Sequence, residues 1–178
     1  MTIKKDGERM NYYKIVKDDV LNGVGFRTTL VICGCQFNCL GCHAQHLKAP
    51  YSGKLFTDET KKEIFNELSK PYIDGFSIFG GEVTHENNID DVTVLLKEIK
   101  EHFPNKSIWV WTGQNFEDIR DKEFLKYTDI LIDGRFILSR RNLNLHWRGS
   151  DNQRIIDVQR TLISNDVVLA TEYYEGRD

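Results

Sequence analysis

The chain has 178 residues, of which 40% are hydrophobic and 11% aromatic, values that suit one soluble globular domain. Its formal net charge of −3 gives no footing for a nucleic-acid surface, so we expect no direct nucleic-acid partner. No stretch is apolar for long enough to span a membrane, and the polar amino terminus lacks the apolar segment of a secretory signal, so we expect a cytoplasmic protein.

Strand and helix patterns alternate along most of the chain. The predicted strands are residues 12–16 (a short strand or a covering segment), 27–33, 75–79, 107–111, 129–133 and 155–162. The predicted helices begin at Thr57 or Asp58, at Asn87 and at Phe116, and run to about residues 70, 103 and 127, with Asn115 as the cap of the third. This alternation predicts an α/β fold with a mainly parallel sheet and right-handed crossovers.

All four cysteines of the chain lie within residues 33–42, directly after the first predicted buried strand. Cys35, Cys39 and Cys42 are spaced C-x3-C-x2-C. Thiolates are the ligands that iron–sulfur clusters require, and a four-iron cubane needs one ligand for each iron. Three cysteines leave one iron open to an amine and a carboxylate, such as the methionine end of S-adenosylmethionine (SAM). The spacing is therefore typical of radical SAM enzymes that hold a [4Fe-4S] cluster.

A zinc site is the alternative for the same stretch. With Cys33 included, four cysteines could close a structural zinc site, and His43 and His46 are close by. Such sites usually draw their ligands as two separated pairs, whereas successive residues are hard to wrap around one ion. Cys33 ends an apolar run, so we predict that it is a small buried thiol and no ligand. Clustered cysteines of this kind indicate metal ligands in a reducing compartment.

Three further predicted strands end in glycine-rich or polar sequences: Gly80-Gly81-Glu82, Thr112-Gly113 and Asp133-Gly134-Arg135. The carboxyl ends of parallel strands lie along one edge of a sheet, where α/β proteins place their chemistry. Paired glycines let the backbone approach a ligand, and a carboxylate accepts hydrogen bonds from an ammonium group. Each sequence alone would predict only a turn. Together with the cysteine loop they predict one cofactor site.

Two residues at the last of these strand ends, and two tryptophans, leave alternatives open. Asp133 is either a structural carboxylate or a ligand contact. Arg135 could pair with Asp133, with Glu82 or with a cofactor carboxylate. Trp109 and Trp111 alternate within a strand, which favours packing inside the fold over stacking on a ligand.

Several longer motifs resemble one family, the anaerobic ribonucleoside-triphosphate reductase activating proteins of the radical SAM superfamily. The resemblance covers about residues 11–154 and rests on Asn11-Tyr12-Tyr13, Asn22-Gly23-x-Gly25, the cysteine loop, Gly80-Gly81-Glu82, Ile108-Trp109-Val110-Trp111-Thr112-Gly113, Ile132-Asp133-Gly134 and Trp147-Arg148-Gly149-Ser150-x-Asn152-Gln153. The cysteine spacing is shared by the whole superfamily, whereas the two tryptophan-containing runs are more specific to this family.

The resemblance implies a fold, two cofactors and a set of contacts. The fold would be a partial, splayed (β/α) half-barrel of the radical SAM type. Cys35, Cys39 and Cys42 would hold one [4Fe-4S] cluster whose open iron chelates SAM. The residues assigned to cofactor binding are Gly41, Cys42, His43, Gly80, Gly81, Glu82, Thr112, Asp133 and Arg135. Within this set the Gly80–Glu82 segment would receive the methionine amino group, and the backbone around Cys42 would lie against the cofactor.

The resemblance also implies an activity and partners. The protein would be an oxidoreductase that cleaves SAM reductively and generates a glycyl radical on the catalytic subunit of the anaerobic ribonucleotide reductase, with an electron donor such as flavodoxin. No general acid or base would be needed on this chain, because the cofactors carry the chemistry. The domain organisation would be a flexible extension (1–10), a radical SAM domain (11–163) and a carboxyl-terminal tail (164–178). The alternatives are a radical SAM enzyme acting on a small molecule and a zinc-stabilised binding module without catalysis.

Overall fold

A computed structural model describes residues 9–174 of the chain. The flexible extension predicted for residues 1–10 falls mostly on residues 1–8, which lie outside the described residues. Met10 differs from that prediction, because its side chain is fully buried and its backbone nitrogen donates to Asp91 Oδ2 over 2.8 Å. Met10 is therefore fixed to the folded part of the chain through its side chain and its backbone.

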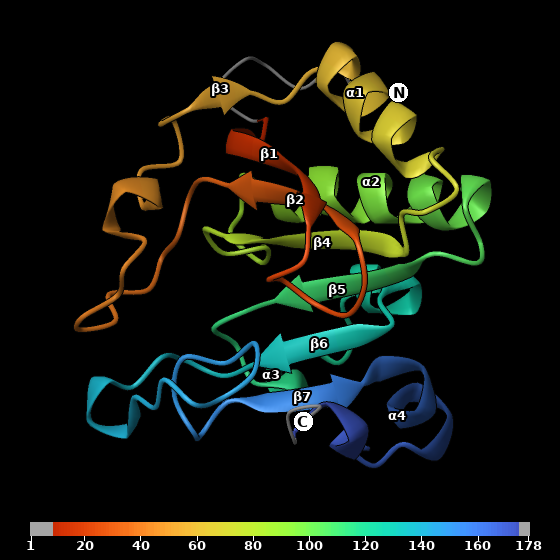
Figure 1. Ribbon diagram of the computed structural model, residues 1–178. Helices are drawn as coiled ribbons and strands as arrows, with labels where there is room; N and C mark the ends of the chain where they lie inside the picture. The colour runs from red at the N-terminus through yellow and green to blue at the C-terminus, as the bar shows by residue number, and fades with distance from the viewer. Residues whose placement is uncertain (1–8, 175–178) are drawn as a thin grey trace.

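A single seven-stranded sheet organises the fold, with the strand order β3-β1-β2-β4-β5-β6-β7 (Figure 1). The strands are β1 (Asn11–Asp19), β2 (Arg27–Ile32), β3 (Lys54–Leu55), β4 (Gly75–Gly80), β5 (Ser107–Trp111), β6 (Ile130–Asp133) and β7 (Arg154–Asp157). The four central strands β2, β4, β5 and β6 are parallel, which confirms the predicted α/β fold. The outer strands β1, β3 and β7 are antiparallel additions at the two edges.

The two long helices match the sequence prediction closely. Helix α1 (Asp58–Leu68) is capped by Thr57, whose side chain accepts from the Thr60 backbone in a reciprocal capping box. Helix α2 (Ile89–His102) carries Asp90 and Asp91 in its first turn, where carboxylates favour the helix dipole. None of the helices within residues 9–174 is long and apolar enough to cross a membrane.

The helix predicted over residues 116–127 is wrong in length. The chain instead forms the short helix α3 (Phe116–Ile119) and, after extended backbone at Lys122, the 3₁₀ helix η2 (Glu123–Tyr127). Phe124 and Leu125 are both buried against the core, and this break lets two neighbouring side chains turn inward. Packing has therefore overridden the continuous helical pattern.

The strand predicted over residues 155–162 is also shorter than expected. β7 ends at Asp157, whose side chain accepts from the backbone of Arg160 over 3.0 Å and caps helix α4 (Val158–Ser164). The described part of the predicted tail covers β7: Ala170 donates to the Ile155 carbonyl, and the Tyr174 hydroxyl accepts from the Ile155 amide. The 3₁₀ helix η4 (Thr171–Tyr173) lies within this covering segment.

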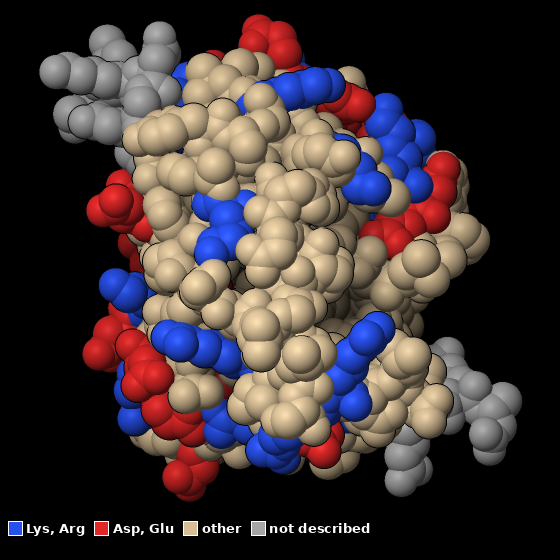
Figure 2. All heavy atoms as spheres, turned by 90° about the vertical axis from the view of Figure 1, so that its left-hand side faces the viewer, with Lys and Arg blue, Asp and Glu red and all other residues tan. Residues whose placement is uncertain are grey.

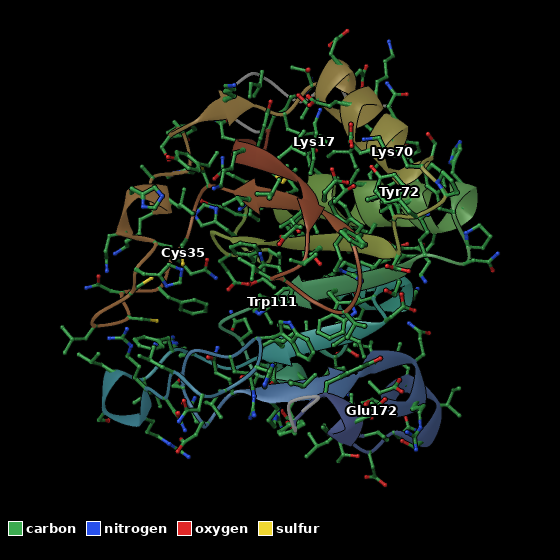
Figure 3. All side chains as sticks on the ribbon, viewed as in Figure 1. Lys17, Cys35, Lys70, Tyr72, Trp111 and Glu172 are labelled. Carbon is green, nitrogen blue, oxygen red and sulfur yellow. The ribbon has the colours of Figure 1, made fainter. Side chains whose placement is uncertain are left out.

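The two faces of the sheet serve different purposes. One face packs against the helices and forms the main apolar core, with Phe76, Ile78 and Val110 among its buried residues. The other face carries Phe79 and Trp111, which line a cavity instead. Figure 3 shows Cys35 on the side of the molecule where the parallel strands end, whereas Lys70 and Tyr72 lie at the opposite end.

A candidate cofactor site at the strand ends

The cysteine loop leaves the sheet at the carboxyl end of β2 and is held by backbone hydrogen bonds at its start. The Gly34 and Cys35 amides donate to the carbonyls of Leu47 and Lys48 over 2.8 and 3.0 Å, just past the 3₁₀ helix η1 (Gln45–Leu47). Cys33 is fully buried in a small apolar cluster and does not line the site, as predicted from its position after an apolar run.

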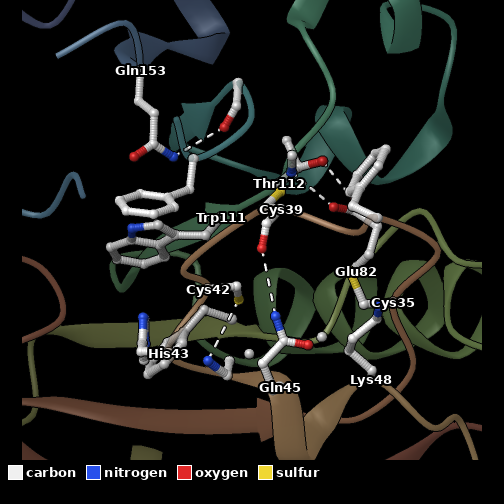
Figure 4. A pocket seen from close by; sticks show the side chains of 18 residues that line it. Cys35, Cys39, Cys42, His43, Gln45, Lys48, Glu82, Trp111, Thr112 and Gln153 are labelled. Atoms are coloured by element: carbon white, nitrogen blue, oxygen red, sulfur yellow. Dashed lines mark hydrogen bonds between the residues drawn. The ribbon is translucent and has the colours of Figure 1, made fainter. Parts of the chain in front are cut away.

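Cys35, Cys39 and Cys42 line one cavity of about 170 Å³ (Figure 4). All three are free, partly exposed thiols, so the structure brings together the three predicted ligands. Within residues 9–174, no three His, Cys, Asp or Glu side chains are gathered closely enough to hold a single metal ion. One zinc ion needs its sulfur ligands about 2.3 Å from one point, whereas a cubane binds each thiolate through a different iron. The donor set therefore fits a cluster better than a single zinc ion.

The glycine loop after β4 lies directly against the start of the cysteine loop. Gly81 N donates to Ile32 O and Glu82 N to Gly34 O, both over 2.7 Å. A Cβ atom at Gly81 would lie 2.5 Å from the Gly34 oxygen and 2.7 Å from the Cys33 carbonyl carbon. Only glycine allows this approach, so the sequence Gly80-Gly81 sets the distance between the two loops.

The Glu82 carboxylate is buried and links two strand ends. Its Oε1 atom accepts from the backbone and hydroxyl of Thr84 and, over 2.6 Å, from the hydroxyl of Thr112. Among residues 9–174, its Oε2 atom accepts one bond, from the Gly113 amide over 2.7 Å. Glu82, Thr112 and Gly113 all line the cavity, so these predicted residues do converge. Oε2 is the atom of this carboxylate that can still accept a bond from a ligand.

Asp133 and Arg135 lie outside the cavity lining, which includes only Gly134 from that strand end. The Asp133 carboxylate accepts from Arg154 over 2.5 and 3.0 Å and from the Phe116 amide over 2.8 Å, so it caps helix α3 in place of Asn115. The Arg135 guanidinium lies 4.3 Å from the ring centroid of Phe37. Their positions give no support to the cofactor contacts predicted for both residues.

A second cavity of about 600 Å³ adjoins the first, and both are lined by Cys42, His43 and Trp111. Ligand pockets for molecules of SAM's size usually measure about 300–1,000 Å³, so the first cavity alone is too small, whereas the adjoining one reaches this size. Gly41 lines the second cavity, and a side chain there would collide with Leu138 of the 3₁₀ helix η3 (Leu138–Arg140) at 2.8 Å. The cysteine loop therefore contacts the loop that follows β6.

Several lining residues were missed by the sequence analysis: Phe37, Gln45, Lys48, Phe79, Phe136 and Gln153. Trp111 was predicted to pack inside the fold, but it is only partly buried and faces the site. Strand alternation was a usable signal for it, because Trp109 and Trp111 share the face that carries Phe79. Gln153 has a structural part as well: it donates to Gly134 O and accepts from the amides of Gly149 and Ser150.

Charge is unevenly distributed around the site. Residues 20–57 contain no Asp or Glu, although the whole chain has 27 acidic residues. Figure 2 shows basic atoms around a largely uncharged centre on this face, with acidic atoms mostly toward its edges. Burial raises the pKa of the Cys35 thiol above its ordinary value. A metal must therefore displace the proton of this thiol.

A buried arginine lies at the amino-terminal end of β2, outside the cavity lining. Arg27 is fully buried, donates to Ser77 Oγ over 2.6 Å, and lies 5.4 Å from the ring centroid of Trp109. Burial lowers its pKa to about 10, which still leaves the guanidinium charged at neutral pH. Further bonds to the Phe76 and Ser107 carbonyls tie together β2, β4 and β5 near the start of these strands.

Comparison with known proteins agrees with this arrangement. A family model described as a 4Fe-4S single cluster domain matches residues 21–156. The anaerobic ribonucleoside-triphosphate reductase-activating protein of Enterobacteria phage T4 is 42% identical over 146 residues, which cover 82% of this chain and 93% of the relative. Proteins of the same name from Haemophilus influenzae and Escherichia coli K12 are 37% and 34% identical, over 82% and 81% of this chain and 97% and 96% of their own. The chain belongs to the family of anaerobic ribonucleoside-triphosphate reductase-activating proteins and carries its 4Fe-4S domain.

Proposed function

We propose that this protein is a radical SAM activase that generates a glycyl radical on an anaerobic ribonucleotide reductase. The observation that carries the proposal is the shared cavity, where three free cysteines of one loop face the Gly80–Glu82 loop. The curated relatives are named as activating proteins of that reductase, which supports the choice of partner. The parallel centre of the sheet, with its strand ends at one edge, is compatible with a splayed half-barrel spanning residues 11–163.

The residues of this chain bind and orient. Cys35, Cys39 and Cys42 would hold the cluster, and the Gly80–Glu82 loop would bind the amino group of SAM. When bound, the cluster and SAM supply reductive cleavage of the sulfonium and the radical chemistry that acts on the reductase. Thr112 and the Gly113 amide hold the Glu82 carboxylate in place.

Water exclusion is the second task of the site. Phe37, Phe79, Trp111 and Phe136 give the cavity apolar walls, so a reactive species formed there would be shielded from solvent. The cavity lining contains one carboxylate, Glu82, which already accepts four hydrogen bonds. This bonding supports a role for Glu82 in binding and orienting a ligand.

The electron donor would approach the cysteine loop from outside. This loop lies in the acid-free segment 20–57, and Lys48 is the cation among the residues lining the first cavity. An acidic one-electron carrier such as flavodoxin would meet little like-charge repulsion on this surface. We expect its reduction rate to fall as ionic strength rises, since screening weakens attraction between exposed charges.

The test is anaerobic incubation of the reconstituted protein with SAM and a reductant, with and without the reductase, followed by quantification of 5′-deoxyadenosine. We expect 5′-deoxyadenosine from the wild type and none from Cys39→Ala. A colourless protein that binds zinc and cleaves no SAM would favour the zinc-stabilised binding module. SAM cleavage that leaves the reductase without a radical, but consumes a small-molecule substrate, would favour the other radical SAM alternative.

A further inference from the structure

A buried amide at the start of helix α2 joins the two loops of the site. Asn88 is fully buried, and its Nδ2 atom donates to Cys33 O over 2.8 Å, to Glu82 O over 2.9 Å and to Gly34 O over 3.3 Å. The Cys33 and Gly34 carbonyls lie at the start of the cysteine loop, and the Glu82 carbonyl belongs to the glycine loop after β4. One side chain therefore bonds to both loops at the point where β2 and β4 separate.

The position of Asn88 makes it a rigid anchor. It precedes α2 as its N-cap residue, and its carbonyl accepts from Val92 over 2.8 Å within the helix. An asparagine here would ordinarily cap the helix with its side-chain oxygen. Asn88 makes no such capping bond, because its amide group is directed at the loops instead. A sequence reading would therefore assign it to the helix and miss this contact.

The burial of Asn88 also indicates that an amide donor is needed at this position. Its Oδ1 atom has no hydrogen-bond partner among the described residues. A buried polar atom without a partner destabilises the folded state. An apolar residue would avoid that cost but would leave the Cys33 and Glu82 carbonyls without this donor. Three acceptors facing one amide group require a donor there, so a carboxylate of the same shape would be repelled.

We propose that Asn88 is a positioning residue that sets the distance between the cluster-binding loop and the SAM-binding loop. This inference rests on the proposed function, since it concerns the geometry of the cavity between Cys35 and Gly81. Asn88 does not line the cavity and touches no ligand there. It acts through the backbone of Gly34 and Glu82, which also bond to each other.

The chain offers a matched control in Gln159. Its side-chain amide also donates to three carbonyls, those of Leu125, Lys126 and Thr128, over 2.7–3.3 Å. Gln159 belongs to α4 and makes these contacts with the η2 segment, away from the cavity lining. Replacing either amide removes the same kind of bond, but only Asn88 connects the loops of the site.

The test compares Asn88→Ala, Asn88→Asp and Gln159→Ala after anaerobic reconstitution of the full chain. Three quantities are measured: the rate of iron loss to a chelator, the dissociation constant for SAM, and the melting temperature. We expect both Asn88 variants to lose iron faster and to bind SAM about 10-fold more weakly, the effect typical of losing a supporting contact around a metal site, with Asn88→Asp the weaker binder. Gln159→Ala should lower the melting temperature while iron loss and SAM binding stay as in the wild type.

Two outcomes separate this inference from the proposed function. Wild-type iron retention and SAM affinity in the Asn88 variants, with only the melting temperature lowered, would overturn the positioning role. If the wild-type protein holds a cluster but binds no SAM, the proposed function fails. The positioning role is then decided by iron loss alone, where faster loss in the Asn88 variants than in Gln159→Ala supports it and equal loss overturns it.

Discussion

The edge of the sheet where the parallel strands end forms a rim with two halves, whose polar groups have different partners. One half comprises the ends of β2, β4 and β5, and the other comprises the end of β6 and the start of β7. At the ends of β2, β4 and β5, the cysteines and the Gly80–Glu82 loop face a cavity. At the end of β6 and the start of β7, Asp133 is enclosed by Arg154 and the Phe116 amide, and Glu117 binds the same arginine. Both halves were predicted to contact a cofactor. A carboxylate at a strand end is therefore a candidate for ligand binding only where no cationic side chain from another element pairs with it.

The difference follows from sheet topology. β7 is antiparallel to β6, so Arg154 at its start lies opposite Asp133 at the end of β6. Within the described part of the chain, β4 and β5 pair with parallel strands on both sides, and turns that contain glycine follow their ends. One group of strand ends thus carries an internal ion pair, and the other borders the cavity where we propose that the ligands bind. Four substitutions can test this division.

The largest effect should come from Cys39→Ala. Removing one of three thiolate ligands should abolish cluster binding, because two ligands cannot hold the remaining irons. Iron and sulfide per chain after anaerobic reconstitution measure this loss. Cys33→Ala is the matched control, since Cys33 is buried outside the cavity, and it should keep its iron. A Cys33→Ala protein without iron would show that the ligand assignment is wrong.

Gly81→Ala should have the next largest effect. The new Cβ would press on the Gly34 oxygen at 2.5 Å and force the two loops apart, and a misplacement of about 1 Å at a reactive site can cost about 100-fold in rate. SAM cleavage should fall by about this factor. Gly134 also borders the cavity, but a Cβ there meets no atom closer than 3.7 Å, so Gly134→Ala should cost about 1–3 kcal/mol of stability through its φ of +93° and lower SAM cleavage far less than Gly81→Ala. Equal SAM cleavage by the two variants would contradict the division.

Arg154→Met should destabilise the protein without disturbing the ligand site. It leaves the Asp133 carboxylate, which is 1% exposed, without its cation, and breaking such a pair costs about 3 kcal/mol or more. Thermal unfolding should show the loss, while iron content and SAM affinity stay at wild-type values. If the variant instead keeps the wild-type melting temperature and loses SAM affinity, Asp133 and Arg154 belong to the ligand site.

Glu117→Gln should give the smallest effect, visible in the pH dependence of stability. Hydrogen bonds from Arg154 lower the pKa of Glu117 to about 2, so the carboxylate stabilises the fold above its unfolded pKa of about 4.3. That contribution is lost as the pH falls from about 4 to about 2. The side chain is 56% exposed, so solvent screening should keep the effect below about 1 kcal/mol. Urea unfolding across this pH range should show that the free energy of unfolding falls less steeply with decreasing pH in the variant than in the wild type. The same pH dependence in both proteins would argue against a stabilising Glu117–Arg154 pair.

The sequence predicted the parallel centre of the sheet and the meeting of Cys35, Cys39 and Cys42 at one site, because β-branched runs and close cysteine spacing are local signals. It could not show that Asp133 forms an ion pair with Arg154, since that pairing depends on the antiparallel direction of β7. It also missed Asn88, whose contacts at Cys33 and Glu82 depend on how α2 packs beside the sheet. The break in the helix over residues 116–127 likewise follows from packing, at Phe124 and Leu125.

The direct test of the central claim is electron paramagnetic resonance of the anaerobic reductase after incubation with this protein, SAM and a one-electron reductant. We predict a glycyl radical signal that appears with the wild-type protein and is absent with Cys39→Ala. A reductase that gains no radical from the iron-loaded wild-type protein, yet gains one from a related activating protein under the same conditions, would contradict the proposed function.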